Sequence, residues 1–279
     1  IQMYYDYTPD ATPSYVPEVF AQTATFEDDF SGTDDWIDDG TAIVVNTSTD
    51  VIDWSSPHAG GHDQCYYDLT SVSDTNWIVD FDITYDTVTS GSDVDGTYLT
   101  ICLDSITANA PTVGHDALGI TYELDNTPSN NASIATFSCD NLNLYDAMEL
   151  NTPTGTISIF TETAQASETH YVRMIRDGAT FTVYIYSDIT RQTLIESQSV
   201  DANDAGTVSG LRYLKVMETF DNTNDHTFDG TIDNVKFWNN ISAFDREPLT
   251  WNSNYKAVHH LQGNSTDSTV YGNDGTDTA

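Results

Sequence analysis

A strict alternation of apolar and polar residues in one segment constrains the fold more than any other feature of this chain. In the run WIVDFDITYD, one set of alternate positions is apolar: Trp77, Val79, Phe81, Ile83 and Tyr85. The positions between them are polar: Asp80, Asp82, Thr84 and Asp86. Because successive side chains of a strand point to opposite sides, this period of two predicts a β-strand that covers a core with one face. Such a strand needs partner strands, which the rest of the chain must supply.

Further β-rich runs recur along the chain. They read GTYLTICL, LGITYEL, TISIF, GLRYLKVM and TIDNVKFW. In HYVRMIRDGATFTVYIYSD, two such runs flank Asp177-Gly178, a dipeptide that tolerates the positive φ of a tight hairpin turn. Lys, Glu, Leu and Ala are scarce, whereas Asp, Thr, Ser and Asn are abundant, and this balance disfavours long helices. We therefore predict an all-β chain that folds as an antiparallel β-sandwich or jelly roll.

The charge and the cysteines of the chain exclude several classes of partner and site. Acidic residues number 44 against 8 basic ones, a formal net charge of -36. Phosphate backbones and anionic headgroups repel such a polyanion, so we expect no nucleic acid partner and no direct membrane insertion. The three cysteines fit no CxxC metal or redox pattern and allow at most one internal disulfide: Cys65, Cys102 and Cys139.

The central part of the chain resembles a known superfamily. It begins with FEDDFSGTDDW, continues through RDGATFTVYIYSD and GLRYLKV, and ends with GTIDNVKFWN. These runs are similar to the opening strand, hairpin and closing strand of concanavalin A-like lectin/glucanase domains, and the similarity covers about residues 26–243. The resemblance implies a jelly-roll β-sandwich. Because members of that superfamily differ widely in function, it implies the fold more strongly than an activity.

Both flanks resemble parts of other domains. Residues 1–25 are similar to the tail and linker of a β-domain that precedes lectin-like domains in archaeal, bacterial and viral surface proteins. Residues 244–279 contain a linker and then YKAVHHLQGNSTDSTVYGNDGT, which is similar to the start of a second, laminin G-like domain. The resemblance therefore implies a longer multidomain polypeptide, located outside the cell at a cell or virion surface.

The superfamily resemblance also implies a structural calcium ion between the first and last strands. Suitable hard oxygen ligands are Asp28 and Asp29 in the opening strand, and Asp229 and Asp233 in and before the closing one. Calcium takes six to eight oxygens, which carboxylates and loop carbonyls can supply together. The alternative is that these four residues are solvated acids in a chain that is rich in aspartate.

One Gly-rich stretch has the composition of a sugar-binding loop. WSSPHAGGHDQCYY brings together five candidate carbohydrate-binding residues: Trp54, His58, His62, Tyr66 and Tyr67. Aromatic rings can stack on pyranose faces, while imidazoles and acids bind hydroxyl groups. The alternative is that Trp54 and one of the two tyrosines belong to the core and that the histidines are solvated.

Catalysis is not expected. Laminarinase-type members of the superfamily use an ExDxxE strand whose carboxylates act as nucleophile and acid. GITYELDNTP places Glu123 and Asp125 on one strand face, but Pro128 stands where the second Glu is required. A glycoside hydrolase is therefore the most distant alternative, and we predict that the chain is not an enzyme.

Four Asn-x-Ser/Thr sequons would accept N-glycans if the chain passes through a glycosylating export route. They begin at Asn46, Asn131, Asn240 and Asn264. Sequence rich in Asn, Ser and Thr produces such triplets by chance, so they support an extracellular glycoprotein only weakly.

Two functions remain open. The first is a structural building block of a surface layer, filament or virion fibre, whose partners are other copies of the chain or neighbouring surface proteins. The flanks favour it, because incomplete β-domains would pair with neighbours. The alternative is a carbohydrate-binding adhesin module with a glycan partner, which should show exposed aromatic rings on one face of a sheet.

Overall fold

The computed structural model describes eleven parts of the chain. They are residues 24–31, 35–38, 42–55, 63–89, 98–108, 114–124, 131–142, 144, 154–203, 207–218 and 227–241. All of them belong to one unit of the chain, Ala24–Ser242. The flanking segments predicted at 1–25 and 244–279 lie outside the described residues, apart from Ala24 and Thr25. No helix in the described parts is long and apolar enough to cross a membrane.

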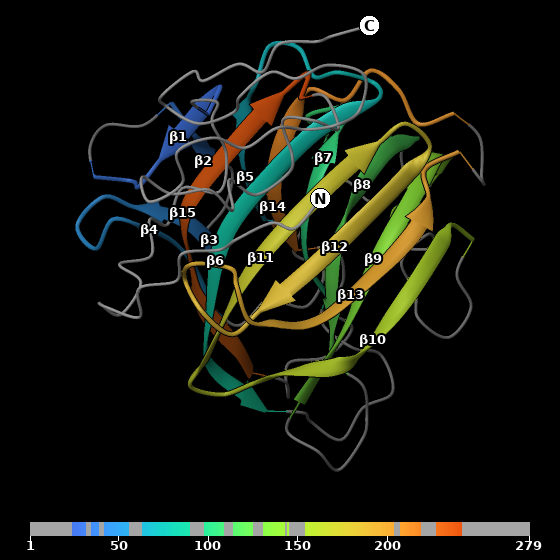
Figure 1. The fold of residues 1–279 in the computed structure, drawn as a ribbon. Coiled ribbons are helices and arrows are strands. Elements are labelled where there is room, and N and C mark those ends of the chain that lie inside the picture. The colour runs from blue at the N-terminus through green and yellow to red at the C-terminus, as the bar shows by residue number, and fades with distance from the viewer. Residues whose placement is uncertain are drawn as a thin grey trace, which may run out of the picture. The chain divides into compact units, whose positions relative to one another are not determined.

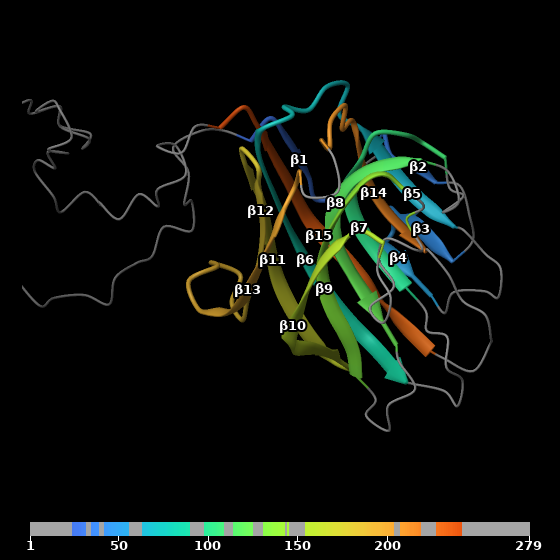
Figure 2. The same cartoon turned by 90° about the vertical axis from the view of Figure 1, so that its right-hand side faces the viewer.

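The described residues form two antiparallel β-sheets. In spatial order, sheet A contains β13 (Leu194–Asp201), β12 (Thr180–Tyr186), β11 (Glu168–Asp177), β6 (Asn76–Thr89), β15 (Thr227–Asn239), β4 (Val51–Trp54) and β3 (Ile43–Asn46), and β1 (Phe26–Asp28) also pairs with β15. Sheet B contains β10 (Thr156–Gln165), β9 (Asn131–Leu142), β8 (His115–Glu123), β7 (Tyr98–Asp104), β14 (Tyr213–Glu218), β5 (Gln64–Asp68) and β2 (Ile37–Asp38). Figure 1 and, after a quarter turn, Figure 2 show the sheets as two stacked layers. The predicted antiparallel β-sandwich is confirmed.

The alternating segment forms β6, in the middle of sheet A. Its apolar residues, among them Trp77, Phe81 and Tyr85, are buried between the sheets. Neighbouring strands β11 and β15 pair with β6 on either side along most of its length. The predicted strand is confirmed, and its apolar face lies in the middle of the core.

The hairpin predicted around Asp177-Gly178 is formed by β11 and β12. Asp177 pairs with Thr180, so Gly178 and Ala179 make a two-residue loop. Gly178 has a φ of 61°, which glycine adopts without the steric cost of a side chain. The hairpin is confirmed.

The first and last strands of the sandwich lie side by side. Phe26 pairs with Phe237, and Asp28 pairs with Val235. The DDF and TIDNV segments that carry the superfamily resemblance are therefore neighbours, which is the arrangement that the resemblance implies.

Arginines cover the outward side of β6 in sheet A. Arg173 donates two hydrogen bonds to the Asp80 carboxylate, at 2.7 and 2.6 Å, and Arg191 donates one to Asp82 at 2.7 Å. Burial by itself raises the pKa of Asp80, but the charges of Arg173 and Arg191 outweigh it and the net shift is downward. Asp80 and Asp82 therefore both have arginine partners within the protein.

Candidate functional site

The aromatic residues predicted to bind sugar divide between the interior and the surface. Trp54 is buried at the end of β4, with its ring centroid 5.7 Å from that of Phe228. Tyr67 packs inward against Phe26, with ring centroids 4.1 Å apart. Its neighbour Tyr66 points to the other side of β5. Trp54 and Tyr67 thus follow the core alternative, and Tyr66 is the one of the three that faces outward.

Strand pairing places Tyr66 in a row of residues that crosses the outer face of sheet B. The row consists of Ile37, Tyr66, Lys215, Cys102, Gly119, Phe137 and Ile157. The adjacent row consists of Asp68, Tyr213, Asp104, Ala117 and Cys139. Directly paired residues share a face, so two tyrosines and several polar groups lie together on this side of the sandwich.

Three of these side chains and that of Arg212, which directly precedes β14, form a partly exposed group at one side of the face: Tyr66, Asp68, Arg212 and Tyr213. We name this group the aromatic edge. The two tyrosine rings meet edge to face, with centroids 5.8 Å apart and planes at 86°. The Arg212 guanidinium lies 5.2 Å from the centroid of the Tyr213 ring and donates hydrogen bonds of 2.7 and 2.6 Å to Asp68. These bonds raise the pKa of Arg212 and lower that of Asp68. The Arg212 and Asp68 side chains are 46% and 38% exposed, so solvent reaches both.

A buried polar group lies beside the aromatic edge on the same face. His115 Nδ1 is 2.7 Å from Asp104 Oδ2, and Lys215 Nζ donates to the same oxygen at 3.1 Å. Segment 105–108 covers the group, since its carbonyls accept hydrogen bonds from Lys215 at 3.1 Å and from Gln64 at 2.9 Å. The side chains of His115, Asp104 and Lys215 are fully buried. These hydrogen bonds link strands β7, β8 and β14 to segment 105–108, and the three side chains present no polar atoms to solvent.

The aromatic edge offers the groups that a sugar needs. A tyrosine ring provides an apolar surface for the C–H side of a pyranose, with a hydroxyl at its rim. The paired guanidinium and carboxylate of Arg212 and Asp68 provide planar donors and acceptors for neighbouring hydroxyls. This mixture of aromatic surface and a few fixed polar groups is typical of small-molecule sites.

Sequence reasoning found Tyr66 but missed its partners. Alternation in GLRYLKVM does place Tyr213, Lys215 and Met217 on one side of a strand. The sequence did not reveal which strand lies beside β5, because Asp68 and Arg212 are 144 residues apart.

All three cysteines are buried. Cys65 packs in the core between the sheets, whereas Cys102 and Cys139 pack with Phe137 and Met217 on the outer side of sheet B. Burial raises the pKa of the Cys102 and Cys139 thiols well above the usual range.

The aspartates predicted to bind calcium do not form one group. Asp28 accepts hydrogen bonds from Phe30 N at 2.7 Å and from Trp36 Nε1 at 3.0 Å, which engages both of its oxygens. Asp229 lies four extended residues from Asp233, a Cα separation of about 13 Å. That distance is too long for two such short side chains to bind one calcium ion.

Asp29 and Asp233 remain close enough for their charges to interact. Burial raises the pKa of Asp233, and the carboxylates of Asp29 and Asp50 raise it further. Asp50 was not among the predicted ligands, since nothing in its sequence context distinguishes it from other aspartates. Of the two carboxylates that raise the pKa of Asp233, Asp29 was predicted as a ligand and Asp50 was not.

The other predicted positions are only partly described. Five lie outside the described residues: His58, His62, Asp125, Pro128 and Asn264. Glu123 is buried at the end of β8.

The three described sequons differ in exposure. Asn46 donates a hydrogen bond to Asp53 at 2.6 Å, and Asn131 donates one to Thr163 at 3.2 Å. Asn240 is exposed, with a φ of 56°. Of these three, Asn240 is the best placed to accept a glycan.

Neither protein-family models nor curated proteins match this chain. Among solved structures, it is similar to the exoplasmic/lumenal domain of VIP36 in its Ca2+-bound form, with 11% identity and a TM-score of 0.50 over 79% of this chain and 93% of that one. It is also similar to the legume lectin-like domain from Entamoeba histolytica (8% identity, TM-score 0.46, 73% and 89% of the two chains). The alginate lyase from Klebsiella pneumoniae gives 12% identity and a TM-score of 0.46 over 72% and 85%. The chain has a lectin-like jelly-roll fold.

Proposed function

We propose that this chain is a carbohydrate-binding, lectin-like module that binds a neutral glycan at the aromatic edge of sheet B. The observation that carries the proposal is the edge itself, in which two partly exposed tyrosine rings stand beside the solvent-exposed Arg212–Asp68 pair. A lectin-like fold that presents such a group on an outer sheet face supports binding in preference to a purely structural role.

Charge argues for a neutral ligand. The net charge of -36 repels sulfated and uronic acid polymers at long range. The two cations on this face, Arg212 and Lys215, are already paired with Asp68 and Asp104. Neither is left to neutralise a carboxylate or sulfate of the ligand.

The proposal is for binding without catalysis. On this face Asp104, His115 and Lys215 are fully buried and do not reach a ligand on the surface, and the exposed Asp68 carboxylate is already paired with Arg212. Incubation with neutral polysaccharides should therefore release no new reducing or unsaturated ends. Release of such ends would assign the face to an enzyme.

A glycan array probed with the full chain tests the function. We expect binding to one or more neutral glycans and none to sulfated or uronic acid glycans. An array without any bound glycan, or with only acidic ones, would contradict the proposal. A duplicate array in EDTA separates direct recognition by the aromatic edge from recognition that needs a metal ion.

We also infer that calcium stabilises the sandwich near the first and last strands, through Asp29, Asp50 and Asp233. Asp29 and Asp50 each raise the pKa of Asp233, so their carboxylates could draw together around an ion, and the similar VIP36 domain was solved with Ca2+ bound. Calcium at 100 times its dissociation constant should add about 2.7 kcal/mol to the free energy of unfolding. The melting temperature should rise in the wild type and in Asp229→Asn but not in Asp233→Asn. An unchanged wild-type melting temperature would rule out the site.

A second candidate function, self-association in an extracellular surface assembly, is favoured by exposed apolar side chains on the last strand of each sheet at one side of the sandwich. Ile159 on β10 and Leu194 and Ile195 on β13 are 48%, 48% and 36% exposed. These edge strands lie against each other, and Ser158 Oγ donates to Gln198 at 2.8 Å between them. Exposed apolar side chains that lie together commonly mark a contact with another chain, and the partner we propose is a second copy.

Sedimentation velocity measurements test the self-association. The wild type and Ile37→Lys should associate as concentration rises, and Leu194→Lys should stay monomeric. A wild type that is monomeric at every concentration would remove this candidate.

A further inference from the structure

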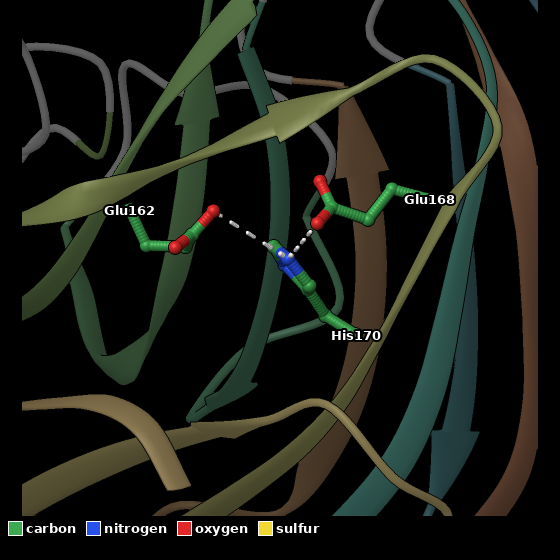
Figure 3. A group of neighbouring side chains, drawn as sticks. All are labelled: Glu162, Glu168 and His170. Carbon is green, nitrogen blue, oxygen red and sulfur yellow. Dashed lines mark ion pairs between the residues drawn. The ribbon is translucent and has the colours of Figure 1, made fainter.

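We propose that Glu162, Glu168 and His170 form a binding site for a divalent first-row transition metal ion of the Zn²⁺ class. Their ligand atoms lie within 4.8 Å of one another, and no other three His, Cys, Asp or Glu residues in the described parts of the chain do so. Figure 3 shows both glutamates directed at the imidazole. The site contains no residue of the aromatic edge, so it does not rest on the proposed glycan binding.

The buried imidazole points to a missing ligand. His170 is fully buried, and its Nδ1 lies 3.2 Å from the Tyr85 hydroxyl. Its Nε2 makes no hydrogen bond, although almost all buried polar atoms in proteins have a partner. A histidine that binds a metal through Nε2 usually has its other ring nitrogen held by an outer partner. Tyr85 occupies that position.

The electrostatics of the cluster favour a cation. Burial lowers the pKa of His170 and disfavours its charged form, with Glu168 and Glu162 acting in the opposite direction. The Tyr85 hydroxyl also contacts the ring, and burial raises its pKa well above the usual range, so it carries no charge. In the tautomer that donates Nδ1–H to the Tyr85 hydroxyl, the Nε2 lone pair faces two carboxylates. A divalent ion bound by Nε2 and by one oxygen of each carboxylate would replace the repulsion among these three groups with attraction to the ion.

The distances fit a small ion. His170 Nε2 lies 3.3 Å from Glu168 Oε1 and 4.0 Å from Glu162 Oε1. Neighbouring ligands of a tetrahedral zinc ion with bonds of 2.0–2.1 Å are about 3.4 Å apart. Only the Glu162 carboxylate needs to move closer. The Glu162 and Glu168 side chains are 24% and 33% exposed, so an ion could enter and keep water in its remaining position.

A break in strand register aims Glu162 at the histidine. The pairing of β10 with β9 shifts between Ile159 and Thr163. The Glu196 carboxylate of β13 accepts hydrogen bonds from Thr161 N and Glu162 N, both at 2.9 Å, and so holds the displaced backbone. Bulges of this kind commonly re-aim a side chain next to a functional site.

Glu168 and His170 are two residues apart on β11, so their side chains lie on the same side of that strand. Glu162 comes from β10, in the other sheet. An ion bound by all three would join sheet A to sheet B. One imidazole with two carboxylates suits zinc and its neighbours better than calcium or magnesium, which prefer oxygen alone.

Titration calorimetry on the metal-free full chain tests the proposal, with Zn²⁺ as the probe and millimolar Ca²⁺ and Mg²⁺ present to occupy carboxylate sites of low selectivity. The wild type should bind one equivalent of Zn²⁺, and its melting temperature should rise by about 5–10 °C at 100 times the dissociation constant. Glu162→Gln and Glu168→Gln should each weaken binding at least tenfold. Glu27→Gln, an exposed glutamate on β1, is the matched control and should bind as the wild type does.

Nitrogen NMR of the wild type gives an independent answer that needs no variant. One equivalent of Zn²⁺ should shift the Nε2 resonance of His170 and leave its Nδ1 protonated. The proposal is overturned if Zn²⁺ does not move that resonance, or if both glutamine variants bind Zn²⁺ as tightly as Glu27→Gln. Should a glutamine variant fail to fold by circular dichroism, the resonance alone decides.

Discussion

Tyr66 and Tyr67 are adjacent in the sequence and yet have opposite environments. Because side chains alternate along β5, one tyrosine must face sheet A while the other faces solvent. The sequence predicted that one of the pair belongs to the core, but not which one. The choice depends on Phe26 and Trp36, which come from other segments and pack against Tyr67. A register shift of one residue would have exchanged the two roles.

Gly230 is the residue whose replacement should damage the core most directly. A Cβ atom there would lie 2.1 Å from the Thr84 carbonyl oxygen and 2.4 Å from the Trp54 ring. Gly230→Ala should therefore lower the free energy of unfolding by about 1–3 kcal/mol, because neither the strand nor the buried indole can move away. Urea unfolding followed by tryptophan fluorescence measures the change.

Gly210→Ala is the matched control, since a Cβ atom there meets nothing within 4 Å and the cost comes only from its φ of 67°. Its loss should be about 1 kcal/mol. If Gly230→Ala were the more stable of the two variants, this result would contradict the close packing of the Trp54 ring on Gly230 of β15.

Glu196 should give the chain a measurable pH dependence. Burial raises the pKa of Glu196, but hydrogen bonds from the Thr161 hydroxyl and from the Glu162 and Thr161 N–H groups outweigh it and hold the pKa at about 2. A folded pKa below the ordinary value of 4.5 means that the ionised group stabilises the fold above pH 4.5. This contribution is lost as the pH falls from 4.5 toward 2.

Glu196→Gln should therefore be less stable than the wild type at pH 7, by about 1 kcal/mol for a partly screened group. The difference should shrink at pH 3. Urea unfolding at both pH values measures it, with Glu27→Gln as an exposed control. A difference that stays constant with pH would show that the lost contacts, and not the charge, matter.

At the scale of strands, the sequence predicted those features that depend on interactions between residues close together in the chain. The alternation in β6 and the turn at Gly178 could be predicted because each depends on residues next to one another in the chain. The aromatic edge could not, because it requires the pairing of β5 with β14. The Glu162–Glu168–His170 cluster also escaped prediction, since the bulge that aims Glu162 is held by Glu196 from a third strand.

The outer layer of sheet B makes a prediction about thiol chemistry. Thiolate is the reactive form of cysteine, and burial raises the pKa of Cys102 and Cys139 while Cys65 is buried in the core. All three should resist alkylation in the native protein and react together in urea. Mass spectrometry after timed iodoacetamide treatment counts the modified thiols. Rapid native labelling of Cys102 or Cys139 would mean that this layer opens easily.

For the whole molecule, the net charge of -36 should make added salt stabilising. Repulsion among so many carboxylates penalises the compact state, and raising the salt concentration shortens the screening length from about 30 Å at 0.01 M to about 8 Å at 0.15 M. The chain has only 8 Lys and Arg residues, so surface ion pairs that salt would weaken are few. The melting temperature should therefore rise with sodium chloride over this range, with calcium held saturating. A fall would contradict the account of the charge.

The central claim is that the outer face of sheet B binds glycan through its aromatic edge. Calorimetric titration of the strongest glycan from the array, against the wild type and three variants, tests it most directly. Tyr66→Ala and Tyr213→Ala should each weaken binding at least tenfold, about 1.4 kcal/mol. Tyr184→Ala is the control, because it removes a ring on the outer face of sheet A that stacks on Tyr186 with ring centroids 6.3 Å apart. It should leave the affinity unchanged. Loss of affinity in Tyr184→Ala with unchanged binding in the other two would place the site on the opposite sheet and contradict the claim.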